Sequence, residues 1–422
     1  MLRVAFCAYD KPDSIGGPQT WLAHLLPALY EYGIESSCLF LTHWGDTGPC
    51  LESLRKHGVD CEQTACQEHT RERIKWILAH LRQKSPDIFV PNLVVAGYFA
   101  GRWVRAAGIP TVGVLHSDDP FYRGIRDEFV FGRKAFRVSA LACVSRELES
   151  QAVALKPRDT MIERIPYGVE VPAKEREKTK GCLRIAYVGR LAEEQKQISQ
   201  VARSLCRVIS EIPGTEAVLY GDGPDRRNVE QVIASMGLEL PIRMAGRVPA
   251  DEIQSHLLDC DVLVLLSDYE GLPIAVLEAM ACGVVPVCLR MRSGVPELVE
   301  DGVTGLIVDD RGDELVRAIA RLQCESGLWQ RLSRAAKSRV SSNYSHQACV
   351  ERWADLFFRI QARVKGKQVI SIPSVMVLPR TNPALSSADP RPSPPVLPLR
   401  IYRRGRKFAG RIRRRLSGQR IW

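Results

Sequence analysis

DVLVLLSDYEGLPIAVLEAMACG, residues 261–283, contains the signals for a strand, a loop and a helix in direct succession. The apolar run at 261–267 predicts a buried strand, and residues 268–272 predict a short loop. Pro273 suits the first residue of a helix, where its missing N–H costs nothing, and Gly283 can end that helix. A buried strand that leads at once into a helix is typical of a βαβ unit, so the stretch predicts an α/β fold.

Two carboxylates have unusual positions in this unit. Glu270 comes just before the predicted helix, and Glu278 lies on its second turn within an otherwise apolar run. Free amides at a helix N-terminus can hold anions and hydroxyl groups, and doubly wound sheets bind ligands at the carboxyl ends of their strands. The alternative for Glu278 is a buried structural glutamate with a local partner, since glutamate is seldom buried unpaired.

The rest of residues 1–345 repeats this alternation of buried strands and helical stretches. Residues 18–33, PQTWLAHLLPALYEYG, have apolar side chains at helical spacing. We therefore predict parallel sheets covered by helices on both faces. The predicted strands are LRVAFCAY (2–9), SSCLFLT (36–42), DIFVP (87–91), TVGVLH (111–116), ALACVS (140–145), LRIAYVG (183–189), EAVLYG (216–221), IRMAG (242–246), DVLVLLS (261–267), VVPVCL (284–289) and TGLIVD (304–309).

A stretch rich in proline, glycine and charge, PYGVEVPAKEREKTKGC (166–182), interrupts the alternation and reads as a linker. After the second α/β region comes one more helical pattern, HQACVERWADLFFRI, followed by eight prolines between 373 and 398. The predicted organisation is an N-terminal domain at 1–168, a linker at 169–182, a C-terminal domain at 183–345, a crossing helix at 346–364, a disordered proline-rich spacer at 365–398 and a basic amphipathic tail at 399–422.

The formal net charge of +11 comes from the C-terminal end of the chain. Residues 361–422 hold 15 Lys and Arg against one acid, Asp389, whereas the rest has 44 basic and 47 acidic residues. Such a segment favours an anionic surface, either a membrane or nucleic acid. Phe408, Ile412 and Trp422 favour the membrane and disfavour nucleic acid, with a solvated extension as the alternative.

The composition excludes several classes of protein. A hydrophobic fraction of 45% with 25% charged residues is that of a soluble globular protein. The 13 cysteines form no CxxC pair, which fits a reducing cytosol better than a disulfide scaffold. The first residues, MLRVAFCAYD, read as a strand rather than a signal peptide. We expect a cytoplasmic protein that can lie on the inner face of the membrane.

Five spaced motifs resemble the retaining glycosyltransferases of the GT-B fold, specifically family 4. The resemblance covers nearly all of residues 1–345 and implies two Rossmann-like domains that face each other across a cleft. The motifs are the E-x7-E pair Glu270 and Glu278, GRLAEEQK (189–196), YGDGP (220–224), SGVPELVEDGVTGLIV (293–308) and GGPQTWLAHL (16–25) after the first strand.

The resemblance implies that a nucleotide-diphosphate sugar lies in the cleft as the donor substrate. Arg190 and Lys196 are cations suited to the charge that develops on the leaving phosphate. Gly16 and Gly17 would let backbone amides approach the diphosphate, because no Cβ blocks them. An ordinary βα turn is the alternative for the glycines, and solvated surface charge is the alternative for Lys196. The family usually has glycine after this lysine, whereas this chain has Gln197.

The resemblance also assigns the hydroxyl contacts of the donor. Glu278 would accept hydrogen bonds from the ribose, and Glu270 would accept them from the transferred sugar. Gly271, Leu272 and Ile274 would contact the donor beside them, with the amides of Leu272 and Ile274 assisting. The usual E-G-F-G is here Glu270-Gly271-Leu272-Pro273, and the proline removes one amide donor.

His116 ends a predicted strand, and the resemblance makes it a contact of the transferred sugar, with a structural histidine as the alternative. Asp118 and Asp119 follow it, but we expect no metal site and no cofactor. The implied mechanism retains configuration: the acceptor hydroxyl attacks from the face that the phosphate leaves, and a phosphate oxygen takes its proton. No dedicated protein base is then required.

We therefore expect a hexosyltransferase that acts on a glycan or lipid-linked acceptor in polysaccharide or glycolipid assembly. A nucleotide-sugar epimerase or hydrolase on the same fold is the enzymatic alternative. A membrane- or nucleic-acid-binding protein on a degenerate scaffold is the non-enzymatic one. The presence of His116, Arg190, Lys196, Glu270 and Glu278 favours transfer. The nucleotide base, the sugar and the acceptor are left open.

Overall fold

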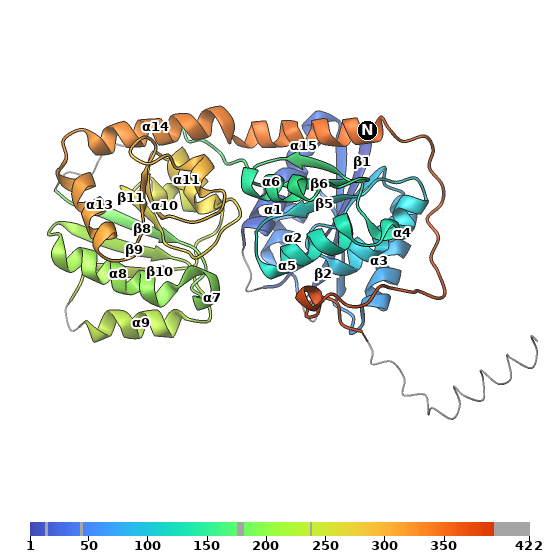
Figure 1. The fold of residues 1–422 in the computed structure, drawn as a ribbon, viewed down its shortest axis with the longest axis horizontal. Coiled ribbons are helices and arrows are strands. Elements are labelled where there is room, and N and C mark those ends of the chain that lie inside the picture. Colours follow the sequence, from blue (N-terminus) through green and yellow to red (C-terminus); the bar gives the residue numbers. More distant parts are fainter. Residues whose placement is uncertain (13–15, 43–44, 175–180, 237–238, 392–422) are drawn as a thin grey trace, which may run out of the picture.

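The computed structural model describes residues 1–12, 16–42, 45–174, 181–236 and 239–391. Two α/β domains lie side by side along the long axis of the molecule (Figure 1). The chain passes from the N-terminal domain to the C-terminal domain once and returns through a long helix that covers the top of the N-terminal domain (Figure 1). The predicted division into two α/β regions followed by a further helix at 346–364 can be followed along the chain in the order of the elements.

Among its described residues, the N-terminal domain has seven parallel strands. A bridge between Phe89 and Thr111 joins the order β3-β2-β1-β4 to the order β5-β6-β7. The strands are β1 (Leu2–Asp10), β2 (Ile34–Thr42), β3 (Asp60–Ala65), β4 (Ile88–Val90), β5 (Val112–Leu115), β6 (Ala140–Cys143) and β7 (Met161–Arg164). The helices are α1 (Gly17–Ala28), η1 (Leu29–Tyr32), α2 (Pro49–Lys56), α3 (Thr70–Lys84), α4 (Val95–Ala106), α5 (Pro120–Arg126), η2 (Asp127–Phe131), η3 (Lys134–Phe136) and α6 (Arg146–Ala154).

In the part of the C-terminal domain that the structure describes, six parallel strands have the order β10-β9-β8-β11-β12-β13. Counted within each domain, both sheets begin with the order 3-2-1-4, as in a doubly wound dinucleotide fold. The strands are β8 (Leu183–Val188), β9 (Thr215–Tyr220), β10 (Ile242–Gly246), β11 (Val262–Leu265), β12 (Val285–Leu289) and β13 (Leu306–Val308). The helices are α7 (Glu193–Lys196), α8 (Ile198–Glu211), α9 (Arg226–Ser235), α10 (Ile253–Leu257), α11 (Ile274–Ala281), α12 (Val295–Leu298), α13 (Asp313–Cys324) and α14 (Leu328–Asn343).

The crossing helix α15 (His346–Gln361) belongs to the C-terminal end of the chain but packs on the N-terminal domain. The Trp353 ring lies 5.4 Å from the Trp21 ring, and the Phe357 ring lies 6.2 Å from the Phe6 ring, measured between centroids. The helix therefore completes the apolar core of the N-terminal domain and holds the two domains together.

Residues 362–391, here called the C-terminal strap, run down the outer side of the N-terminal domain (Figure 1). The predicted disordered spacer is wrong for residues 365–391, because Ile370, Met376 and Leu385 between the prolines are buried against that domain. Leu385 belongs to the short turn η4 (Pro383–Leu385), which packs on α5. Residues 392–398 of the predicted spacer and the predicted tail at 399–422 lie outside the described residues.

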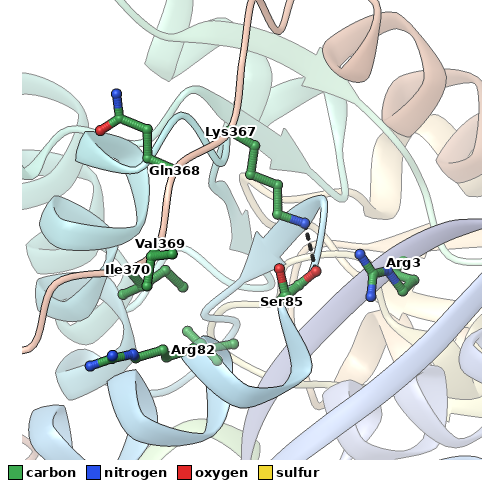
Figure 2. Close-up of a pocket in the computed structure, with 8 residues that line it drawn as sticks. Arg3, Arg82, Ser85, Lys367, Gln368, Val369 and Ile370 are labelled. Atoms are coloured by element: carbon green, nitrogen blue, oxygen red, sulfur yellow. Dashed lines mark hydrogen bonds between the residues drawn. The ribbon is translucent and has the colours of Figure 1, made fainter.

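Polar contacts also fix the strap. Thr70 donates a hydrogen bond of 2.7 Å to the buried carboxylate of Asp389. Lys367 Nζ donates to the carbonyl oxygen of Ser85 at 2.6 Å and pairs with Asp87 at 3.0 Å. Figure 2 shows Lys367 beside a pocket of about 350 Å³ between the strap, the end of α3 and Arg3. Within the described part of the chain, no helix is long and apolar enough to cross a membrane.

Candidate active site

The predicted site residues gather where the carboxyl ends of the strands of both sheets face each other. Gly16 and Gly17 begin α1 after β1, and His116 follows β5. On the other domain Arg190 follows β8, and Glu270 lies between β11 and α11. In both sheets the strand order reverses between the first and the fourth strand, and doubly wound sheets bind ligands at this switch point.

Backbone contacts bring the two halves of this site together. A Cβ atom on Gly271 would lie 1.9 Å from the carbonyl oxygen of His116, so the loop after β11 rests on the end of β5. A Cβ atom on Gly17 would lie 3.1 Å from Ile274 Cδ1 at the start of α11. Only glycine permits the first approach, and any larger residue at position 271 would push the domains apart.

Lys196 and Glu270 form an ion pair in which Nζ and Oε1 are 2.5 Å apart. The two side chains are 16% and 9% exposed, so the pair is largely shielded from water. Such a pair holds both groups in one geometry, because either charge left alone at this depth would be costly. The structure thus joins two residues that the sequence places 74 positions apart.

Gln197 forms a left-handed turn directly after Lys196. Its φ of 50° and ψ of 45° lie in the left-handed region, which is unfavourable for a residue with a Cβ. Its side chain donates to Asp268 at 2.6 Å and accepts from Gln200 at 2.8 Å. The side-chain amide of Gln195 donates from Nε2 to the carbonyl oxygen of Tyr269 at 2.8 Å. These bonds tie the loop that carries Lys196 to the loop that carries Glu270.

Arg190 owes its position to two glycines of the YGDGP motif. A Cβ atom on Gly221, which has a φ of 143°, would lie 1.9 Å from the carbonyl oxygen of Gly189. A Cβ atom on Gly223 would lie 2.3 Å from the carbonyl oxygen of Leu191. The loops after β8 and β9 therefore pack backbone to backbone. Arg190 is exposed on this platform, and the described residues offer its guanidinium no ion pair or hydrogen bond.

Glu278 is a buried carboxyl group on α11. Its helix begins one residue later than predicted, because Pro273 has the extended backbone of an N-cap residue. Burial alone raises the pKa of Glu278 to about 8. Among the described residues, no side chain forms a hydrogen bond with this carboxyl group, so the alternative of a glutamate with a local partner gains no support.

The ring of His116 is enclosed by protein. The Asn92 amide oxygen can only accept, so Nε2 of His116 donates to it at 2.7 Å, and Nδ1 accepts from the Tyr167 hydroxyl at 2.5 Å. The Trp21 ring lies 5.1 Å away, edge to face. Burial lowers the pKa of His116 to about 3, so the imidazole is neutral. Contact between His116 and a sugar stays a prediction.

Asn92 was not identified from the sequence. It follows β4 with a φ of 41° and is buried, and its Nδ2 has no hydrogen-bond partner among the described residues. A left-handed asparagine at the carboxyl end of a strand is the kind of strained residue that clusters at functional sites. The only sequence signal is its place directly after DIFVP, at the end of a predicted strand.

The two aspartates after His116 are engaged within the protein. Asp118 accepts from Arg123 at 3.0 Å and from Gln151 at 3.1 Å, and Asp119 caps α5 by accepting from the Tyr122 amide at 3.0 Å. Among the residues that the structure describes, no three His, Cys, Asp or Glu side chains are grouped as metal ligands would be. The expected absence of a metal stays a prediction.

Comparison with known proteins agrees with the motifs. Residues 172–339, which cover the C-terminal domain, match the family model of glycosyl transferases group 1. The amylovoran biosynthesis glycosyltransferase AmsK of Erwinia amylovora is 28% identical over 67% of this chain and 73% of its own length. The putative teichuronic acid biosynthesis glycosyltransferase TuaC of Bacillus subtilis is 28% identical over 61% of this chain and 69% of its own length. The predicted resemblance to group 1 glycosyltransferases is confirmed.

Solved structures extend the likeness to both domains. The crystal structure of Anabaena Alr3699/HepE with UDP has a TM-score of 0.68 at 18% identity, and covers 85% of this chain and 100% of its own. Sucrose-phosphate synthase from Thermosynechococcus elongatus has a TM-score of 0.67 at 17% identity, with coverage of 86% and 100%. The predicted GT-B architecture is therefore confirmed for the described residues.

Proposed function

We propose that the protein is a glycosyltransferase that moves a hexose from a nucleotide-diphosphate sugar to a glycan or lipid-linked acceptor in polysaccharide or glycolipid assembly. The observation that carries the proposal is the contact between two Rossmann-like domains at this site: Gly271, next to the Glu270–Lys196 pair, lies against the backbone of His116, and Ile274 lies against Gly17 at the N-terminus of α1. The biosynthetic roles in the names of AmsK and TuaC, and the UDP-glucose complex of HepE, support the choice of substrate class.

The charges of the C-terminal domain suit a diphosphate leaving group. Arg190 is an exposed cation on a rigid platform, and Lys196 is oriented by its bond to Glu270. As the bond between the sugar and the phosphate breaks, negative charge grows on the phosphate oxygens, and fixed cations stabilise that charge most where water is excluded. The second oxygen of Glu270 and the carboxyl group of Glu278 would accept hydrogen bonds from the sugar and the ribose.

Binding of the nucleotide is the first test. Melting temperatures of the full chain would be measured with UDP, GDP and ADP and with the glucose or mannose conjugate of each. A ligand that binds only the folded protein raises the melting temperature, by an amount that grows with its concentration relative to Kd. One nucleotide and its sugar should stabilise the chain clearly more than the others. Equal, negligible shifts with all of them would contradict the proposal.

We further propose that transfer retains the anomeric configuration and needs neither a cofactor nor a bound metal. The acceptor oxygen would form its bond to the anomeric carbon on the face that the phosphate leaves, and a phosphate oxygen would take the acceptor proton. NMR of the product formed with the stabilising donor would give an α-linkage from an α-linked donor, and turnover would persist in EDTA. A product with inverted configuration would reject the retaining mechanism. Loss of turnover in EDTA would reject the proposal that no bound metal is needed.

For residues 399–422 we propose contact with an anionic membrane surface, supported by their arginines and interleaved apolar side chains. The full chain would be sedimented with vesicles of phosphatidylcholine alone and with added phosphatidylglycerol. Replacement of Arg413, Arg414 and Arg415 by Gln should weaken binding to the anionic vesicles and leave donor binding unchanged. Equal sedimentation of both proteins would reject the membrane contact.

A further inference from the structure

Glu297 joins the two domains beside the candidate site. It lies on α12 within SGVPELVEDGVTGLIV (293–308), a motif that the donor contacts above leave without a role. Its side chain is only 6% exposed. A carboxylate at this depth persists only where protein groups replace its water, and these groups come from the opposite domain.

Both oxygens of Glu297 are bonded to the N-terminal domain. Oε2 accepts from Arg164 Nε at 3.1 Å, and Nη2 of the same guanidinium lies 2.8 Å from this oxygen in an ion pair. Oε1 accepts from the backbone N–H of Arg146 at 3.0 Å, at the N-terminus of α6. The guanidinium of Arg146 lies 3.7 Å away. A charge-assisted hydrogen bond from a guanidinium, together with the N–H at a helix N-terminus, is a strong and directional way to hold a carboxylate.

The segment that carries Glu297 also supports the loop that carries Glu270. The N–H of Gly294 donates to the carbonyl oxygen of Gly271 at 2.7 Å, and a Cβ atom on Gly294 would lie 2.4 Å from that oxygen. Gly271 in turn rests on the backbone of His116. Because Gly294 comes directly before α12, any motion of Glu297 away from Arg164 would move the 270–272 loop away from the N-terminal domain.

We propose that Glu297 is a positioning residue, which binds Arg164 and α6 in the closed arrangement of the domains and thereby sets the 270–272 loop against the N-terminal domain for reaction. The inference rests on the proposed transferase function. In the open arrangement Glu297 loses its cross-domain partners, and the loop loses the surface of His116. Closure of the site and placement of the sugar-binding carboxylate Glu270 are thus one event.

The experiment compares Glu297→Gln, Arg164→Gln and the double variant in the full chain. Glu300→Gln is the matched control, because Glu300 is three residues away and pairs with Arg339 of its own domain at 2.7 Å. The measurements are Kd for UDP, GDP and ADP, kcat and KM for the donor that the wild type consumes, and the radius of gyration by X-ray scattering with and without that donor. Thermal unfolding checks that each variant folds.

For Glu297→Gln we expect a nucleotide Kd within about twofold of the wild type and a loss of kcat of at least about tenfold, the scale of losing one partner of a buried charge pair. The donor should no longer reduce the radius of gyration. The double variant should be no worse than the poorer single variant, since both remove one interaction. If Glu297→Gln does not fold, Arg164→Gln tests the same contact from the other domain.

A kcat and a scattering response equal to those of Glu300→Gln would overturn the inference. Loss of nucleotide binding together with kcat would also overturn it, since Glu297 would then act as a donor contact or as a general structural residue. If the wild type binds nucleotides but consumes no donor, the transferase proposal fails. The radius of gyration with bound nucleotide still decides whether Glu297 holds the closed arrangement.

Discussion

The two domains share a strand order but present opposite chemistry to each other. Beyond the carboxyl ends of its strands, the C-terminal domain has charged or ionisable groups, namely Arg190, the Lys196–Glu270 pair and Glu278. The corresponding part of the N-terminal domain has the glycines of α1 and a buried, neutral hydrogen-bonded row from Asn92 through His116 to Tyr167. The same strand order thus carries charged groups in the C-terminal domain and closely packed, uncharged groups in the N-terminal domain.

This difference between the domains indicates how two domains with the same strand order would contribute differently to the proposed transfer. In the proposed reaction, cations fixed on one domain would stabilise the charge that develops on the diphosphate and would give the donor a single orientation. The neutral domain would then approach the sugar without competing for the phosphates. Substitutions in the two domains should therefore impair the protein in different ways.

The largest effect should follow the loss of charge on the C-terminal side. Lys196→Ala removes a cation from the leaving phosphate and leaves Glu270 without its partner, so donor turnover should fall by about 10²-fold or more. Arg207→Ala is the control, because Arg207 pairs with Glu211 on the same domain but lies on the exposed face of α8. Steady-state assays of donor consumption would measure both. Near-normal turnover of Lys196→Ala would reject the role assigned to Lys196.

The second prediction concerns the strap, which covers only the N-terminal domain. Leu385 is 1% exposed and lies 3.0 Å from the position that a Cβ on Gly124 of α5 would take. Leu385→Ala should lower the free energy of unfolding by about 2–3 kcal/mol. Val375→Ala, at a side chain that is 77% exposed, should change it by less than about 0.5 kcal/mol. Urea unfolding would compare them, and equal stabilities would mean that the strap is not part of the folded domain.

The strap is also a part of the fold that could not be predicted from the sequence. All eleven predicted strands are present, because buried parallel strands are continuous apolar runs. The edge strands β3 and β7, DCEQTA and MIER, were missed, since polar side chains on exposed edges give no such run. Proline content predicted disorder for the strap, but the isolated Ile370, Met376 and Leu385 fill gaps on a surface that no local pattern reveals.

The candidate site was predictable on one side and largely hidden on the other. The spacing of Glu270 and Glu278 and the GRLAEEQK motif identified the C-terminal residues, and the structure joins Glu270 to Lys196. Asn92, Tyr167 and Glu297 were not identified, because their roles depend on contacts between elements far apart in the sequence. A single asparagine after a strand carries no periodicity that would distinguish it from an ordinary loop residue.

The third prediction uses the buried carboxyl group of Glu278. Burial raises its pKa from 4.5 to about 8, so between these values the unfolded chain releases a proton that the folded protein keeps. The contribution of Glu278 to stability is therefore full below pH 4.5 and is lost as pH rises through about 8. Glu278→Gln removes this loss, and its melting temperature should exceed that of the wild type by several degrees at pH 8.

The difference between these two proteins should shrink as the pH approaches 4.5, the ordinary pKa of a glutamate. The same substitution should weaken nucleotide binding, because an amide has one acceptor oxygen for the ribose hydroxyls where the carboxyl group has two. Differential scanning calorimetry from pH 5 to pH 9 gives the stability, and titration calorimetry gives the affinity. A constant difference in melting temperature across this range would show that Glu278 does not titrate as described.

The smallest effect should come from Gln197, where this chain differs from the glycine that is usual in the family it resembles. Gln197→Gly relieves the left-handed backbone, worth about 1–2 kcal/mol, but loses the side-chain bonds to Asp268 and Gln200. The two terms nearly cancel, so stability and turnover should stay close to those of the wild type. Gln197→Ala keeps the strain without the bonds and should cost about 1–2 kcal/mol in urea unfolding. If alanine is tolerated as well as glycine, the bonds from Gln197 do not hold this loop, and the position of Lys196 must depend on its bond to Glu270.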